Sequence, residues 1–254
     1  MNQTLPSMTE RLACMTPSQL RGMLGHDLRN AAVWIAATAH EGIAAAQLSY
    51  GRMLLDGNGV ARDSAAALQW FRRAADGGDL DAINMVGRCL ENGWGATANG
   101  AEAAVWYRRA AEGRHAWAQY NLAHLYLNGI GVERDTTQAF ALYQRAAEQG
   151  HERAMNLLGR CHEEGLGTRP DFAAAAHWYR CSAEGGYFRG QFNWATLLLK
   201  AGHVQEAANW LERSANGGNQ PVRLAVLALI TTCPHQPLQA LANRLQPRLE
   251  AQAA

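Results

Sequence analysis

The chain repeats itself every 36 residues, and this period restricts its possible folds more than any other feature of the sequence. Small residues recur in three columns of the repeat. These columns are Ala46, Ala82, Ala118 and Ala154; Gly51, Gly87, Ala123 and Gly159; and the pairs Gly57/Gly59, Gly93/Gly95, Gly129/Gly131 and Gly165/Gly167. Such self-similarity is typical of stacked repeats, in which each unit buries its apolar face against its neighbours. The period predicts an elongated, curved solenoid.

Each full repeat is expected to hold two helices, so the fold class is all-α, an α/α superhelical solenoid. In the first full repeat, helix A covers about residues 46–55 and helix B about residues 63–76. A glycine supplies the left-handed conformation that ends helix A, and no strand precedes it as a dinucleotide-binding loop would require. The column Asp63, Asn99, Asp135 and Asp171 suits the N-cap of helix B.

About five such helix-turn-helix repeats are expected at residues 43–218. Full units cover about residues 45–80, 81–116, 117–152 and 153–188, and the fifth is shorter and lacks the second turn glycine. Residues 1–42 are expected to form a degenerate capping unit, in which Thr16 and Pro17 look like a helix start. Residues 219–254 are expected to add two closing helices, near 221–230 and 238–249. Terminal repeats differ from the others because their outer face meets water.

Charge and hydropathy argue against several classes of partner. The formal net charge of +1 gives no bulk attraction to nucleic acid or to an anionic membrane surface. No apolar run approaches the roughly 20 residues that span a bilayer, and the N-terminal segment lacks the apolar stretch that secretion requires. We therefore expect a cytoplasmic protein that binds neither nucleic acid nor membrane.

The five cysteines are expected to be free thiols. Their number is odd, and no two have the CxxC spacing of redox or metal motifs. Cys89 and Cys161 occupy one column two repeats apart, which is too far for a disulfide, so both are interpreted as small core residues. Cys161 and Cys181 share a repeat and are the one pair that a disulfide could join.

The repeat resembles the Sel-one-like repeat family, a branch of the tetratricopeptide-like α/α solenoids. The shared pattern is A-x4-G, a G-x-G turn often followed by valine (Val60, Val132), an aspartate, and W-Y/F-x-x-A-A-x-x-G, over about residues 26–218. Departures are Ala96 and Thr168 in place of valine and Ala123 in place of glycine. The resemblance implies a right-handed superhelix with helices A on the concave face. It also implies an adaptor or scaffold for protein complexes, in processes such as signalling, secretion or bacterial competition.

The polar face of the A helices is the candidate binding surface. Counted from Ala46 at about 100° per residue, positions one, five, eight and nine are apolar and share one face, so positions three, seven and ten lie opposite. The candidate partner-binding residues, which also include neighbouring rim positions, are Arg52, Asn84, Arg88, Trp117, Tyr120, Asn121, His124, Arg153, Asn156, Arg160, Arg189 and Asn193. The third repeat lies at the centre of this set.

This surface is chemically suited to an extended peptide with acidic groups. Asparagine can pair with both polar groups of a backbone amide, arginine pairs with carboxylates, and tryptophan or tyrosine supplies rigid apolar contact. Arg88 and Arg160 flank His124 in one column, which favours an acidic side chain or a C-terminal carboxylate as the ligand group. The alternative is a merely solvated face, with Arg88 paired to Glu91 and Arg160 paired to Glu163 or Glu164.

No cofactor, metal or catalytic group is indicated. His115 and His151 share a column a full repeat apart and cannot hold one metal ion, and His162-Glu163-Glu164 is not an HExxH motif. Trp94 lies outside the repeat pattern and either packs onto the next turn or contacts a partner. We expect a non-enzymatic protein-interaction scaffold of unassigned oligomeric state. The alternative, a hydrolase of the cell-wall or β-lactam kind, rests only on family analogy, and the chain lacks Ser-x-x-Lys.

Overall fold

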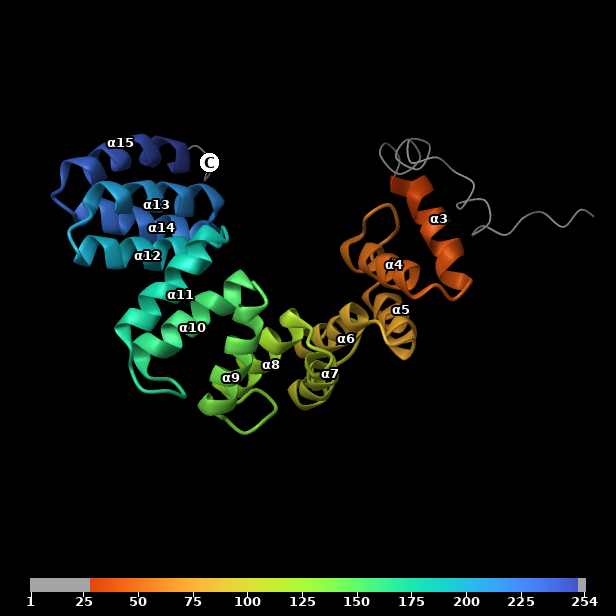
Figure 1. Ribbon diagram of the computed structural model, residues 1–254. Helices are drawn as coiled ribbons and strands as arrows, with labels where there is room; N and C mark the ends of the chain where they lie inside the picture. Colours follow the sequence, from red (N-terminus) through yellow and green to blue (C-terminus); the bar gives the residue numbers. More distant parts are fainter. Residues whose placement is uncertain (1–27, 251–254) are drawn as a thin grey trace, which may run out of the picture. The chain divides into compact units, whose positions relative to one another are not determined.

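The computed structural model describes residues 28–250, which form helices and no strands (Figure 1). The 13 helices of this part are α3 (Leu28–His40), α4 (Ala44–Asp56), α5 (Ser64–Asp76), α6 (Leu80–Asn92), α7 (Gly100–Glu112), α8 (Ala116–Asn128), α9 (Thr136–Glu148), α10 (Glu152–Glu164), α11 (Phe172–Glu184), α12 (Phe188–Lys200), α13 (Val204–Gly217), α14 (Gln220–Thr232) and α15 (Gln236–Glu250). The all-α fold class is confirmed. The start expected at Thr16 and Pro17 lies outside the described residues.

The chain divides into two compact units, Met1–Arg134 and Asp135–Ala254. In the described part of the first unit, each helix from α3 to α8 packs on the next helix in the sequence. In the second unit, α9 to α15 do the same, and α15 also packs against α13. Both units are thus built from successive helix pairs, as the 36-residue period predicts. The subdivision into residues 1–42, 43–218 and 219–254 stays a prediction.

Helix B begins at the polar residue that the repeat places there. Asp63, Asn99, Asp135 and Asp171 each lie before a B helix and accept a hydrogen bond from a backbone N–H of its first turn. These bonds satisfy donors that have no partner within the helix. At Asp135 the N–H of Gln138 also lowers the pKa of the carboxyl group. The predicted N-cap column is confirmed at all four positions.

Helix A begins two residues earlier than predicted. α4 begins at Ala44 and not at Ala46, and the other A helices shift in the same way. Asp79, His115 and His151 supply the N-caps of α6, α8 and α10, each accepting from the backbone N–H three residues later. The residues before α4 and α12, Ile43 and Tyr187, form no side-chain cap hydrogen bond. The sequence pattern excluded a joint metal-binding role for His115 and His151, and the structure shows that they cap helices. Residues expected just before the A helices, such as Trp117, therefore lie within the first turn.

The second glycine of each A-to-B turn lets one repeat lie directly on the one before it. Gly95 has φ +79°, and a Cβ there would overlap the carbonyl oxygen of Ser64, the first residue of α5. The turn after α6 therefore packs on the start of the preceding repeat's helix B. The same contact joins Gly59 to Leu28, Gly131 to Gly100 and Ala101, and Gly167 to Thr136. These glycines hold neighbouring repeats in register.

Within a repeat, the glycine column of helix A makes room for an aromatic ring of helix B. A Cβ on Gly87 would lie 2.6 Å from the ring of Tyr107, and Gly51 and Gly159 face Phe71 and Tyr179 in the same way. Because the two helices approach so closely, Tyr107 in the second repeat is fully buried and Tyr179 in the fourth repeat is almost fully buried. A glycine or alanine in this column therefore reflects helix packing.

A tyrosine hydroxyl at this contact is paired with a carboxylate. Tyr107 Oη donates to Glu91 Oε2 at 2.6 Å, and Tyr179 Oη donates to Glu163 Oε2 at 2.7 Å. Burial, and then the neighbouring carboxylate, raises the pKa of both tyrosines above its ordinary value of 10.0. Glu91 therefore binds the core tyrosine. The alternative in which Glu91 pairs with Arg88 is wrong.

The tryptophan column of helix B packs against an arginine one turn later. Arg73 lies 4.5 Å from the ring of Trp70, Arg109 lies 5.6 Å from Trp106, and Arg213 lies 4.7 Å from Trp210. Such cation–π contacts cover the indole and keep the charge in water. Local packing thus explains Arg73, Arg109 and Arg213.

The four described cysteines are free, as predicted. Cys89 and Cys161 are buried, and desolvation raises the pKa of each thiol to about 11. Because the thiolate is the reactive form, we expect iodoacetamide at about pH 8 to label Cys181 and Cys233, which are half-buried, well before Cys89 and Cys161. Peptide mass spectrometry of the folded protein measures this order. Equal labelling of all four would contradict the packing of the A helices.

Arg114 occupies a left-handed position in the B-to-A turn, with φ +63°. The equivalent residues of other repeats are Gly78, Gly150 and Gly186. A side chain in this conformation costs about 1–2 kcal/mol. Glycine avoids this cost, and the extra conformational entropy that glycine loses on folding offsets only part of the benefit. We expect Arg114→Gly to stabilise the protein by about 0.5–1 kcal/mol in urea unfolding. A loss of stability would show that the arginine side chain makes a compensating contact.

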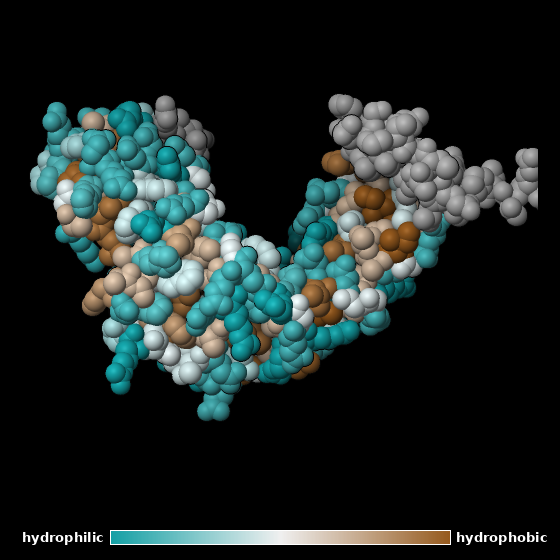
Figure 2. Space-filling view, in the orientation of Figure 1, coloured by the Kyte–Doolittle hydropathy of each residue, from teal (hydrophilic) through white to brown (hydrophobic). Residues whose placement is uncertain are grey.

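The closing helices and the surface complete the described structure. α14 and α15 contribute Val226, Ile230, Leu238 and Leu241 to one core with α12 and α13. On the face seen in Figure 2, apolar residues form separate patches among hydrophilic ones. Within residues 28–250, no helix is long and apolar enough to cross a membrane.

Candidate functional site

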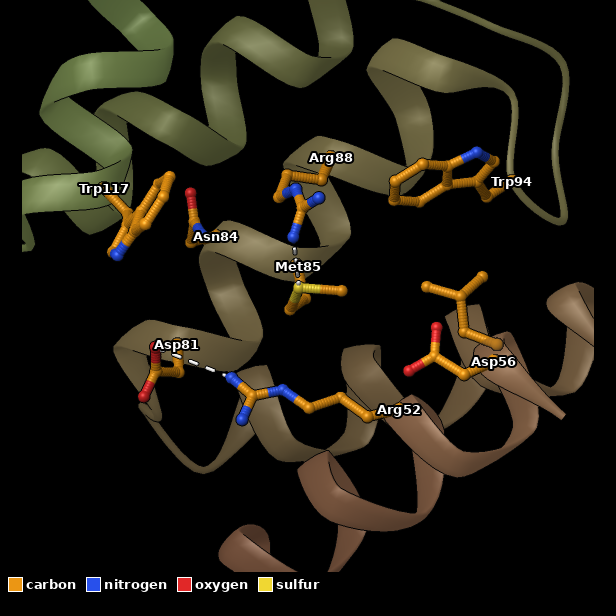
Figure 3. Close-up of a pocket in the computed structure, with 9 residues that line it drawn as sticks. Arg52, Asp56, Asp81, Asn84, Met85, Arg88, Trp94 and Trp117 are labelled. Atoms are coloured by element: carbon orange, nitrogen blue, oxygen red, sulfur yellow. Dashed lines mark hydrogen bonds and ion pairs between the residues drawn. The ribbon is translucent and has the colours of Figure 1, made fainter. Parts of the chain in front are cut away.

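A pocket of about 310 Å³ opens on the A helices of the first compact unit (Figure 3). Its lining residues are Arg52, Leu55, Asp56, Asp81, Asn84, Met85, Arg88, Trp94 and Trp117. α4 supplies the first three, α6 the next four, and α8 supplies Trp117. Trp94 comes from the turn after α6. Four of the predicted binding residues, Arg52, Asn84, Arg88 and Trp117, are therefore brought to one cavity.

Arg88 stands on α6 with its guanidinium in the pocket. Its Nη1 lies 3.5 Å from the Met85 sulfur, and its Cζ lies 5.3 Å from the centre of the Trp94 ring. Within residues 28–250, no carboxylate lies at ion-pair distance from this guanidinium. A methionine and an indole orient the charge without neutralising it, so its remaining N–H donors are available to a ligand.

The structure shows what surrounds the Trp94 side chain. The sequence left open whether this indole packs on the next turn or contacts a partner. Its ring lies beside Arg88 and forms one wall of the pocket (Figure 3). The residue therefore packs against an arginine and also borders a space that a ligand can enter.

Asp81 joins two repeats on the opposite side of the pocket. Its Oδ1 lies 3.8 Å from Arg52 Nη2 and 3.1 Å from His115 Nε2. The other ring nitrogen of His115, Nδ1, accepts the N–H of Ala118 at the start of α8. Because Nδ1 is an acceptor, Nε2 carries the proton that Asp81 accepts. Arg52 is therefore already paired, in contrast to Arg88.

Asp56 is the last residue of α4 and is exposed. Although Arg52 precedes it by one turn, that arginine pairs with Asp81, and the Asp56 carboxylate forms no ion pair within the described residues. A carboxylate at the C-terminal end of a helix meets the negative end of the helix dipole. Figure 3 shows this carboxylate on the α4 side of the pocket, across from Arg88.

The asparagines of the surface pair with each other between repeats. Asn121 Nδ2 donates to Asn84 Oδ1 at 2.9 Å, and Asn193 Nδ2 donates to Asn156 Oδ1 at the same distance. Asn84 and Asn156 are buried. The sequence suggested that the C=O and the NH₂ of each asparagine side chain bind a ligand backbone. In the structure, one of these two groups in each asparagine instead joins adjacent A helices. Asn84 keeps its Nδ2 donors for the pocket.

The remaining candidates of the third repeat lie outside the pocket lining. The ring of Tyr120 packs edge-on against Trp117, with the two centroids 6.0 Å apart. Asn121 is occupied by Asn84. His124 is half-buried, and its carbonyl oxygen accepts the side chain of Asn128. The cavity is therefore centred on the second repeat, one repeat earlier than the predicted centre.

The other five candidates lie in the second compact unit. Arg160 pairs with Glu164 at 3.8 Å, which is one of the alternatives that the sequence allowed. Arg153 lies 5.7 Å from the ring of Tyr187. Asn156 and Asn193 form the second asparagine pair, and Arg189 is exposed in the first turn of α12. Arg160 is thus neutralised, whereas Arg88 in the same column is not.

The candidate set omits five lining residues, Leu55, Asp56, Asp81, Met85 and Trp94. Asp56, Asp81 and Met85 lie at the ends or the rim of the predicted A helices and outside positions three, seven and ten, so the helical period gave them no priority. Trp94 gave a signal, because it is an aromatic residue between turn glycines and outside the repeat. No group of three or more histidine, cysteine, aspartate or glutamate residues in the described part is arranged to hold a metal ion.

Successive helix pairs, with polar residues exposed along the A helices, define this chain as an α-helical repeat protein. The family model for the Sel1 repeat matches residues 44–79, 80–115, 118–151, 152–187 and 204–219. The chain therefore belongs to the Sel1 repeat family, and the resemblance inferred from its sequence is confirmed. No curated protein matches the sequence.

Solved structures support the same assignment. The crystal structure of c5321, a protective antigen present in uropathogenic Escherichia coli strains and displaying an SLR fold, is 30% identical with a TM-score of 0.69; the match covers 90% of this chain. This chain spans 50% of the length of that antigen. A Sel1 repeat protein from Oxalobacter formigenes is 25% identical over 89% of this chain and 97% of its own, with a TM-score of 0.76. Immunity protein Pa5087 from Pseudomonas aeruginosa shares the fold at 14% identity, a TM-score of 0.58, and coverage of 82% and 80%.

Proposed function

We propose that the protein is a non-enzymatic scaffold that holds a peptide segment of a partner protein on its A helices, with the Arg88 pocket as the anchoring point. Sel1 repeats generally mediate protein–protein interaction. The observation that carries the proposal is the arrangement of the pocket, in which an unneutralised guanidinium lies between a methionine and an indole. Fold alone implies no chemistry, so the proposal rests on this site.

The surroundings of the pocket support a peptide as the occupant. Trp117 borders it and is 40% exposed, so a rigid apolar surface continues from the cavity onto α8. Aromatic and arginine residues in such positions contribute much of the binding energy of protein interfaces. Asn84 adds an amide donor at the floor. A carboxylate or carbonyl of the peptide would meet donors from both Arg88 and Asn84.

Removing the Arg88 charge is expected to weaken binding of the partner about tenfold, because the charge-assisted hydrogen bond is lost. The partner is first captured with the wild-type chain from a lysate of its native host and identified by mass spectrometry. Calorimetry then compares Arg88→Gln and Trp117→Ala with the wild-type chain. Affinity should also fall as salt concentration rises.

Arg72→Gln is the matched control for this experiment. Arg72 lies on α5 in the same compact unit, and its exposed pair with Glu102, at 3.7 Å, is outside the pocket. Circular dichroism checks that all variants keep their helix content. If the control weakens binding and Arg88→Gln and Trp117→Ala leave it intact, the binding surface lies on the B helices and the proposed site is wrong.

A further inference from the structure

The pocket contains charges of both signs, and this composition restricts its occupant further. Two arginines and two aspartates line it. Arg52 and Asp81 pair with each other at 3.8 Å. The other two, Arg88 and Asp56, have no charged partner within residues 28–250. One unneutralised cation and one unneutralised anion therefore face the same space.

Resting on the proposed function, we propose that the pocket recognises a dipolar peptide segment, in which an acidic side chain binds Arg88 and a nearby lysine or arginine side chain binds Asp56. A purely acidic segment would bring its charge close to two aspartates. A segment with both charges satisfies both free groups at once. It also places a cation at the end of α4, where the helix dipole favours positive charge.

The two sides of the pocket are also suited to this orientation. Arg88 belongs to α6, and Asp56 ends α4, so the two charges come from adjacent repeats (Figure 3). Leu55 and Trp94 also line the pocket and offer apolar contact to the aliphatic stem of a long basic side chain. The pocket thus holds an acidic group near α6 and a basic group near α4.

A small dipolar metabolite is the alternative occupant, and the structure favours a peptide over it. The cavity of about 310 Å³ is at the lower end of the range for small-molecule sites. It opens next to exposed Trp117, which a small ligand would leave uncovered. A chain that enters the pocket with two side chains and continues across α8 covers this surface.

The test is selection from a library of random short peptides displayed on phage, with the full chain as bait. The wild-type chain is expected to enrich peptides in which an acidic and a basic residue lie within a few positions of each other. Arg88→Gln should remove the acidic preference and keep the basic one, and Asp56→Asn should do the reverse. Asp76→Asn is the control for Asp56, because Asp76 is also an exposed last residue of a helix, α5, outside the pocket.

A synthetic form of the best peptide then gives a double-mutant cycle by calorimetry. Replacing its basic residue by glutamine should weaken binding to the wild-type chain about tenfold, and to Asp56→Asn far less, because the contact is already absent. Additive effects would overturn the pairing with Asp56. The free dipeptide Asp-Lys serves as competitor, and binding as tight as that of the full peptide would overturn the assignment to a peptide.

The outcomes separate this inference from the proposed function. If the library yields acidic peptides with no basic preference, and Arg88→Gln abolishes their binding, the scaffold function stands and the dipolar ligand is wrong. If no peptide is enriched, or if enrichment is unchanged in Arg88→Gln and Trp117→Ala, the pocket does not anchor a peptide and both proposals fail.

Discussion

Replacing Gly95 by alanine is expected to lower the free energy of unfolding by about 3 kcal/mol or more. The left-handed backbone at φ +79° costs a side chain about 1–2 kcal/mol. The new Cβ would also overlap the carbonyl oxygen of Ser64 and lie 2.8 Å from the Cα of Ala65, and backbone atoms cannot move aside without shifting α5. Strain of this kind typically adds 1–3 kcal/mol. Urea unfolding followed by circular dichroism measures the change.

Gly78→Ala separates the two causes. Gly78 has φ +84°, yet a Cβ there would have no other atom within 4 Å. This variant pays only the conformational cost and should lose about 1–2 kcal/mol. If both variants lose the same amount, the turn after α6 does not press on α5, and the contact between the repeats is less close than the structure shows.

Tyr107→Phe is expected to destabilise the protein by about 2 kcal/mol, because Glu91 loses the hydroxyl that donates to it at 2.6 Å. A hydrogen bond to a charged group contributes about 1.5–3 kcal/mol. The first repeat has Phe71 and Leu55 in the same two columns, and both are buried. The double variant Tyr107→Phe/Glu91→Leu, which copies that apolar pair, should therefore recover most of the loss. Urea unfolding of the two single variants and the double variant measures the recovery.

Alkaline pH gives a second measurement on the same variant. The pKa of Tyr107 is raised above 10.0 in the folded protein by burial and Glu91. The stability it contributes is complete below about pH 10 and is lost as the pH rises further, because the unfolded chain releases the proton first. Tyr107→Phe should lose less stability than the wild-type chain above pH 10. An unchanged alkaline dependence would contradict the burial of this hydroxyl.

The helix pairs were predictable because the repeat encodes them several times over. The N-cap column, the glycines that follow the A helices and the packed glycine column each occur in several repeats. The prediction of the helix pairs therefore did not depend on a match at any single position. The starts of the A helices were missed because two of the helices, α8 and α10, are capped by histidine, which is not a common capping residue, and two others, α4 and α12, have no side-chain cap. The exact start depends on a local hydrogen bond that a periodic pattern does not contain.

The candidate site was only partly predictable, for a physical reason. The column pattern identifies which residues share a face, and it grouped Arg52, Asn84 and Arg88, which line one pocket in the structure. It treats equivalent residues alike, however, and so gave Arg88 and Arg160 the same role. The structure pairs Arg160 with Glu164 and leaves Arg88 between Met85 and Trp94. These differences arise from residues outside the repeat pattern, which periodicity averages away.

The close contact of the A-to-B turns at Gly59, Gly95, Gly131 and Gly167 with the preceding repeat determines where the chain tolerates engineering. An affinity tag or fluorescent label inserted beside Gly95 or Gly167 would force neighbouring repeats apart, because those turns lie against backbone. The B-to-A turns at Gly78, Gly150 and Gly186 have open space around them. Tethers for surface immobilisation, or donor and acceptor dyes, therefore belong in the B-to-A turns, where they leave the stacking of the helices undisturbed.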